Sequence, residues 1–471
     1  MKRYTLALAS IFLVPAAFGQ TSTAALTALT ALTLDQAIAT ALQNHRSMQV
    51  SQAALDMAQA QYRQAVAAFG LRVGLEGGFQ RADEDRTFTF NGTVMTPAIS
   101  TPVPGLTIPA QPLPINMDVK MFDRDVTKAG VNASYPLYTG GKEAAVTALA
   151  RKNMEIAKQD QRRTELDVVR DVSRYYHAAQ YARQMEALTG DAAERFQVLE
   201  DLTERLFQSA SLKVKRTDYL RTRTMTAMTR TLMLESRYAA ALTREALANA
   251  MGLPLNATLT LAAQTDVPVL NAALDTLLAQ ASQFNPDRQK LELAVQAADL
   301  QIEDASSGLK PVVGLEANAY QVWNAYQGGL FNDANRTGWT IGIGVKWDLF
   351  DSGMTRAGID AARAGKMKLE AQRVLLDAGQ ALQIKDDFMR IERSRAQWQE
   401  STKAKAFAEE SRTLHEKAYQ SELVETKDVI EAQMIESFAG AALYRAGFEL
   451  RSAIADLDYR VGSSLKGGAK P

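Results

Sequence analysis

The 471-residue chain contains no cysteine, which excludes disulfide bonds, zinc–thiolate sites, thiol catalysis and cysteine lipidation. Only three histidines occur, His45, His177 and His415, and each lies in an amphipathic helical context that favours a surface or packing role over catalysis or metal binding. Lys and Arg number 53, as do Asp and Glu, so net charge does not favour nucleic acid or an anionic surface as a partner. No nucleophile–base pair, phosphate loop or metal-ligand spacing is apparent, so we expect neither an enzyme nor a cofactor.

Long apolar runs are also scarce. Residues 6–18 are mostly apolar, follow a basic start, and are too short to span a bilayer as a helix. Small residues precede a cleavage site predicted at Gln20, so residues 1–19 are predicted to be a secretory signal peptide. Residues 20–33 form a low-complexity spacer of Ala, Leu and Thr. The first helix is predicted to begin after it, with a capping box of Thr33 and Gln36.

Four segments alternate apolar residues with small or polar ones, which is the period of a β-strand. They are predicted at about 71–82, 126–138, 312–323 and 339–350. An apolar outer face with a polar inner face is typical of a membrane β-barrel. A soluble sheet would need a second apolar layer, which the extended flanking helices are not expected to supply. The residues predicted to face lipid are Val131, Tyr135, Val313, Leu315, Ile341, Ile343, Val345 and Trp347.

The chain also contains an internal repeat. Residues 34–253 and 270–463 share one pattern of helix, strand, strand, long helix and helix, and are joined by a linker at 254–269 and followed by a flexible tail at 464–471. Matching positions are 240 residues apart before the strands and 212 apart after them, so the first half carries 28 extra residues between its strands.

Connections and helices complete the repeat. The segment 81–125 has six prolines between Pro97 and Pro114 and is predicted to be an exposed loop, as is the Asn- and Gly-rich segment 324–338. The uninterrupted helical segments 142–208 and 354–420 would each be about 100 Å long.

Two motifs give the sequence a resemblance to the TolC-like outer-membrane channel family. Residues 135–141, Tyr-Pro-Leu-Tyr-Thr-Gly-Gly, match residues 347–353, Trp-Asp-Leu-Phe-Asp-Ser-Gly, and both are similar to the strand exit of that family. Tyr419 followed by Asp428-Val429 resembles the tip motif.

The resemblance implies a mostly α-helical fold with a membrane β-barrel. A homotrimer would form a twelve-stranded barrel in the outer membrane of a Gram-negative bacterium, continued by a long helical tunnel through the periplasm. It also implies the exit duct of a tripartite efflux or type I secretion system. Its partners would be outer-membrane lipid, a periplasmic adaptor (a membrane fusion protein) and an inner-membrane pump. The cargo would be a drug, a metal or a secreted protein.

The same resemblance implies roles at the tip of the helices. Tyr419 would close the resting tunnel, with Asp218 and its neighbour Thr217 as the latch partner. Asp428 and Glu431 would form an acidic ring, since residues three apart share a helix face. The residues expected to contact the adaptor are Ser209, Ala210, Ser421 and Glu422. This chain departs from the family at three positions: Ala210 and Glu422 replace the tip glycine, and Val424 replaces a gating arginine.

Two other functions are compatible with parts of the pattern. A trimeric coiled-coil structural or adhesive surface protein would explain the long helices, although an adhesin needs no duplicated strand exit. A helical enzyme using Glu and His is a third, more remote hypothesis. Single-channel conductance separates a channel from an adhesin.

Overall fold

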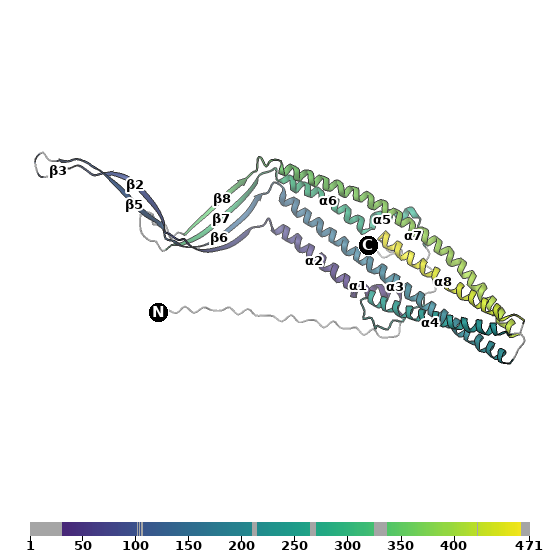
Figure 1. Cartoon of the computed structure of the whole chain (residues 1–471). Helices are drawn as coiled ribbons and strands as arrows, with labels where there is room; N and C mark the ends of the chain where they lie inside the picture. Colours follow the sequence, from purple (N-terminus) through teal and green to yellow (C-terminus); the bar gives the residue numbers. More distant parts are fainter. Residues whose placement is uncertain are drawn as a thin grey trace, which may run out of the picture.

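The computed structural model describes residues 31–100, 102, 104, 107–209, 214–263, 270–324, 337–421 and 423–462. The predicted signal peptide, most of the spacer, the tail and most of the loop 324–338 lie outside the described residues, as do Ala210 and Glu422. The molecule is elongated, with a β-sheet towards one end and long helices running away from it (Figure 1).

The sheet contains four antiparallel strands drawn from both repeats. Its order is β1 (Arg72–Arg81), β6 (Asp125–Tyr138), β7 (Val312–Asn324) and β8 (Thr337–Lys346). The strand pair of the first repeat therefore lies beside that of the second, joined through β6 and β7. Within the described residues, β1 and β8 are the two edges of this sheet.

The register places the alternating apolar residues on one face. Val131 lies opposite Leu75 on one side and Ala319 on the other. Leu315 lies between Tyr135 and Ile343 in the same way. Because directly opposed residues share a face, the odd-numbered positions form a single apolar surface across all four strands. Ile343 and Val345 are 67% and 68% exposed in the single chain.

The predicted strand at 339–350 is wrong at its carboxyl end, because β8 stops at Lys346. Lys346 is paired with Val312, the first residue of β7, so no partner backbone remains beyond it. Trp347 thus follows the strand instead of lying on it, and its indole Nε1–H donates to the Leu309 carbonyl at 3.1 Å.

The strand exits turn through left-handed backbone. Gly141 and Gly353 have φ of 94° and 86° and directly precede the long helices, which explains the glycine of the exit motif. Asp351 accepts hydrogen bonds from the backbone N–H groups of Gly353 and Thr355, at 3.0 and 2.8 Å. Hydrogen bonds from the Thr355 side chain and backbone hold the pKa of Asp351 below its usual value.

The segment 81–125 is not the loop predicted from its prolines. It folds as a ribbon of β2 (Arg86–Met95) paired with β5 (Pro112–Phe122), followed at its end by β3 (Ile99–Ser100) and β4 (Thr107–Ile108). We call these four strands the outer ribbon. A two-stranded ribbon leaves one side of each strand without a ladder, so the prolines of β5 are tolerated there. It extends beyond the end of the four-stranded sheet (Figure 1).

The helices keep the order of the strands. Contacts connect α2 to α3, α3 to α6, and α6 to α7, while α4 packs on α3 and α8 on α7. The long helices α3 and α7 begin and end where the sequence predicts. No helix in the described ranges is both long and apolar enough to cross a membrane. The bounds are α1 (Leu34–Asn44), α2 (Arg46–Ala67), α3 (Lys142–Gln208), α4 (Arg216–Ala250), α5 (Leu274–Phe284), α6 (Pro286–Ser307), α7 (Met354–Gln420) and α8 (Thr426–Val461).

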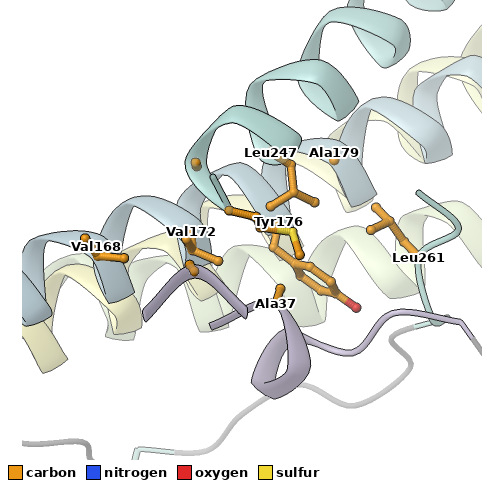
Figure 2. Packing of buried hydrophobic residues seen from close by; sticks show 10 residues of the cluster. Ala37, Val168, Val172, Tyr176, Ala179, Leu247 and Leu261 are labelled. Carbon is orange, nitrogen blue, oxygen red and sulfur yellow. The ribbon is translucent and has the colours of Figure 1, made fainter. Parts of the chain in front are cut away.

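Two equivalent cores lie where the short helices α1 and α5 pack on the long ones. Ala37, Val172 and Leu247 are buried together in the first core (Figure 2). Leu277, Ile384 and Leu457 are buried in the second. Taken in the order given, each residue of the first core matches one of the second. The matched residues are 240, 212 and 210 positions apart, the same offsets that define the repeat in the sequence. The repeat is therefore confirmed by the positions that build the cores.

At the edge of each core, a glycine with left-handed backbone packs against the break between two short helices. Gly252 and Gly462 have φ of 72° and 78°. A Cβ on Gly462 would lie 2.6 Å from the Phe284 carbonyl oxygen, next to the break between α5 and α6. At that break the Asn285 side chain caps α6, because it accepts from Asp287 N–H at 2.9 Å, and it also donates to the Arg460 carbonyl at 2.8 Å.

We predict that Gly462→Ala destabilises the fold. Left-handed backbone costs an L-residue about 1–2 kcal/mol, and the contact with Phe284 adds to that cost. Gly190→Ala is the matched control, because Gly190 lies inside α3 with no atom within 4 Å of an added Cβ. That variant should be neutral or stabilise α3 by up to about 1 kcal/mol. Thermal unfolding in detergent measures both, and equal stabilities would contradict the role assigned to Gly462.

Candidate functional site

The candidate site is the end of the two helical hairpins farthest from the sheet (Figure 1). One hairpin is formed by α3 and α4, the other by α7 and α8. Ser209 and Ser421 are the C-cap residues of α3 and α7, and both are exposed. They therefore lie at the outer limit of each hairpin.

The aspartates of the predicted site have the same local role in both hairpins. The Lys215 backbone N–H donates to the Asp218 carboxylate at 3.0 Å, and the Glu425 N–H donates to the Asp428 carboxylate at 3.0 Å. Each aspartate thus accepts an otherwise unpaired N–H at the start of α4 or α8, where negative charge is also favoured.

Tyr419 lies where the two hairpins meet. It belongs to one buried apolar cluster with Phe196 and Leu199 of α3 and Val429 and Ile430 of α8. Its hydroxyl lies 3.0 Å from the Thr426 hydroxyl. This cluster, which we call the Tyr419 cluster, therefore connects the hairpins through apolar packing, while the Tyr419 hydroxyl has its partner within its own hairpin.

The structure does not join Tyr419 to Asp218. The resemblance implies that these two form the latch, but each has a hydrogen-bond partner in its own hairpin, Thr426 and Lys215. Thr217 is exposed beside Asp218. Asp428 is half-buried and Glu431 exposed, so both carboxylates lie at the surface of the single chain near the start of α8.

A buried ion cluster near the tip was not found from the sequence. Glu436 of α8 is only 5% exposed, and its carboxylate lies 3.2 Å from the Arg195 guanidinium of α3 and 2.9 Å from that of Arg412 of α7. Arg412 also pairs with Glu416 at 2.6 Å. Glu436 therefore connects the hairpins by charge, close to where the Tyr419 cluster connects them by packing. No sequence signal identifies it, since its partners are far apart in the chain.

In the described part of the chain, no three of His, Asp and Glu are grouped as metal ligands would be. His45 caps α2 by accepting the Ser47 N–H at 3.2 Å. The Nδ1 atom of His415 lies 2.8 Å from the Ser411 carbonyl within its own helix.

Comparison with known proteins identifies the family. Residues 37–253 and 277–458 match the family described as outer membrane efflux protein. The chain belongs to this family, and the predicted TolC-like fold and outer-membrane localisation are confirmed. The two matched segments correspond to the two repeats of the sequence. A comparison with curated proteins found no significant match.

Solved structures with the same fold cover nearly the whole chain. The outer membrane protein VceC of Vibrio cholerae is 18% identical, with a TM-score of 0.70 over 92% of this chain and 97% of its own. The Campylobacter jejuni CmeC outer membrane channel is 15% identical, with a TM-score of 0.72 over 91% and 85%. The open state of the Neisseria gonorrhoeae MtrE outer membrane channel is 16% identical, with a TM-score of 0.69 over 92% and 89%.

We predict that Arg195 and Glu436 are energetically coupled across the hairpins. A double-mutant cycle of Arg195→Met and Glu436→Gln should give an interaction energy of about 0.5–3 kcal/mol, measured by chemical unfolding in detergent. Arg205→Met is the matched control, because Arg205 is exposed on the same helix and bonds to the Asp201 carbonyl of its own helix. Additive effects of Arg195→Met and Glu436→Gln would contradict the inter-hairpin connection.

Proposed function

We propose that this chain is one of three identical subunits of a passive export duct in the outer membrane. The duct receives its cargo from an inner-membrane pump through a periplasmic adaptor and is gated at the helical tip. This goes beyond membership of the efflux family, which gives the class of protein but neither the assembly nor the gate.

The proposal rests on the edges of the two layers. The sheet ends at β1 and β8, and the helical layer ends at the helices connected to those strands, α2 and α7. The strand order β1, β6, β7, β8 is continued by the helix order α2, α3, α6, α7. An unpaired strand edge invites another strand, and closed symmetry removes it. If β8 of one chain pairs with β1 of the next, α7 meets the next α2, so one symmetry operation closes both layers. Three chains would give twelve strands.

The helix edges carry the apolar side chains that such an interface needs. Met57 of α2 is 59% exposed, and Val374 and Leu375 of α7 are 65% and 73% exposed. Adjacent exposed apolar side chains such as Val374 and Leu375 are suited to a protein–protein interface when they form part of a contiguous patch. A lone elongated chain would leave these groups in water, and the trimer would bury them.

The two faces of the sheet fit a barrel with lipid outside and water inside. The odd-numbered face carries the lipid-facing residues named above, with Trp347 just beyond the end of β8. The opposite face presents glycine and polar residues such as Asn132, Ser134 and Gly344. In lipid, exposing the apolar face carries no free-energy penalty, whereas in water the same face would have to be covered.

The tip has the features of a gate and a docking point. Two kinds of contact hold the hairpins together: the apolar cluster that contains Tyr419, and the ion pair of Glu436 with Arg195. Opening would require both contacts to loosen. Asp218 and Thr217 would form the latch with a neighbouring hairpin. Three copies of Asp428 and Glu431 would form the acidic ring. Ser209 and Ser421, with Ala210 and Glu422 beside them, are the proposed adaptor contacts.

Neutralising the acidic ring should weaken cation selectivity. In planar bilayers, Asp428→Asn with Glu431→Gln should reduce cation preference and trivalent-cation block, because carboxylates at a constriction attract and hold cations. Asparagine can still accept the Glu425 N–H, so the helix cap is retained.

The matched control removes two carboxylates away from the tip. Asp360→Asn with Glu400→Gln makes the same charge change on α7, where both residues are 73% exposed and paired with a basic side chain. Equal selectivity and block in wild type and the tip double variant would place the constriction elsewhere. A trimer without any conductance would favour the adhesive surface protein.

The lipid-facing assignment predicts a difference between adjacent residues. Val345→Arg should destabilise the folded protein by about 2–4 kcal/mol if the side chain lies near the bilayer midplane. Gly344→Ser on the opposite face should have little effect, because an added Cβ there has no atom within 4 Å. Unfolding from lipid vesicles measures both. If the serine variant is the more damaging, the faces of the sheet are inverted.

A further inference from the structure

The outer ribbon has one apolar and one polar face. Phe88 lies opposite Val119, Phe90 opposite Met117, and Val94 opposite Leu113. Opposed residues share a face, so these side chains form one apolar surface. The residues of this ribbon face are Phe88, Phe90, Val94, Leu113, Ile115, Met117 and Val119.

The other face of the ribbon is mostly polar, with Met95, Pro112 and Pro114 at one end of it. The Thr89 hydroxyl donates to the Asp118 carboxylate at 2.6 Å, and Asn91 lies opposite Asn116. This face has the composition of a surface in contact with water. The two faces therefore differ as the buried and solvated sides of a sheet do, although the ribbon has only two strands.

The apolar ribbon face is uncovered within the single chain. Phe88 and Phe90 are 52% and 49% exposed, and Leu113 is 54% exposed. In the described residues, the extensive contacts of β2 and β5 are with each other. A two-stranded ribbon is at best marginally stable in water and needs a third layer or strand against its apolar side.

The base of the ribbon is fixed to the sheet. The Asp123 N–H donates to the Asn324 side-chain oxygen at 3.0 Å, and the Asn324 amide donates to the Asp123 and Asp125 carbonyls at 3.2 and 3.3 Å. Lys120 pairs with Asp85 at 2.6 Å across the two strands. Since Asn324 belongs to β7, the direction of the ribbon is tied to the second repeat as well as to the first.

We propose that the three outer ribbons of the trimer pack their apolar faces on one another above the outer opening of the barrel. This rests on the trimer proposed above. The ribbon lies beyond the end of the sheet (Figure 1), past the span whose apolar face would contact lipid. It grows from β1 and β6, and β1 is the edge that would pair with the next chain. Threefold symmetry places three copies of the ribbon around one axis, and packing their apolar faces together there would bury these faces and leave each polar face in water.

Single cysteines test this packing directly, because the natural chain has no thiol. Ile115→Cys places a thiol on the apolar face, and Asn116→Cys, one residue on, places it on the polar face. In detergent-solubilised full-length protein, a short bis-maleimide should link two of the three chains in most Ile115→Cys trimers. Asn116→Cys should give at least fivefold less linked dimer. More linkage from Asn116→Cys than from Ile115→Cys would overturn the proposal.

Native mass spectrometry of the same samples separates this proposal from the trimer itself. An intact trimer without Ile115→Cys linkage overturns the ribbon packing and leaves the duct standing, whereas a monomer overturns the duct. A fluorophore on Ile115→Cys that is quenched by brominated lipid would place the face on the membrane and also overturn the packing. Linked Ile115→Cys trimers should conduct at least twofold less than unlinked ones, and unchanged conductance would overturn the position above the opening.

Discussion

The structure depends on one constraint: the strands of the sheet continue into helices in the same order, although strands lie much closer together than helices do. Neighbouring strands lie about 4.8 Å apart, whereas packed helices lie about 8–10 Å apart. Four strands and four helices that keep one order must therefore diverge at every junction. The exits after β6 and β8 accommodate this with left-handed residues directly before α3 and α7. Asp351 then supplies the acceptor that the start of α7 requires.

Much of this architecture follows from the sequence because it rests on local rules. The long helices were predicted at their observed bounds, since Gly141 and Gly353 precede them and no proline interrupts them. The faces of the strands followed from a period of two. The offsets between repeats that the sequence shows recur at equivalent core positions of the structure, such as Val172 and Ile384.

The features that escaped prediction depend on pairing between distant residues. The prolines of segment 81–125 indicated a loop, but Pro112 and Pro114 are compatible with a ribbon that has no third strand. The end of β8 is set by where β7 begins and not by the residues of β8 itself. Glu436 is surrounded by charges from two other helices, which no local pattern could reveal.

The two repeats agree where they build the scaffold and differ where the hairpins meet. Gly252 and Gly462 match, as do Asp218 and Asp428, and each pair has one structural role. The counterpart of Glu436 in the first repeat is Thr226, whose hydroxyl donates to the Phe196 carbonyl at 3.2 Å.

Tyr419 differs from its counterpart in a similar way. That counterpart is Phe207, which stacks on Tyr219 within its own hairpin. Phe207 and Thr226 contact residues of their own hairpin. In the second hairpin, Glu436 pairs with Arg195 of α3, and Tyr419 belongs to a cluster that includes residues of α3. At these two positions the second repeat therefore supplies contacts between the hairpins, whereas the first repeat supplies contacts within one hairpin, so the duplicated sequence is not symmetric at the tip.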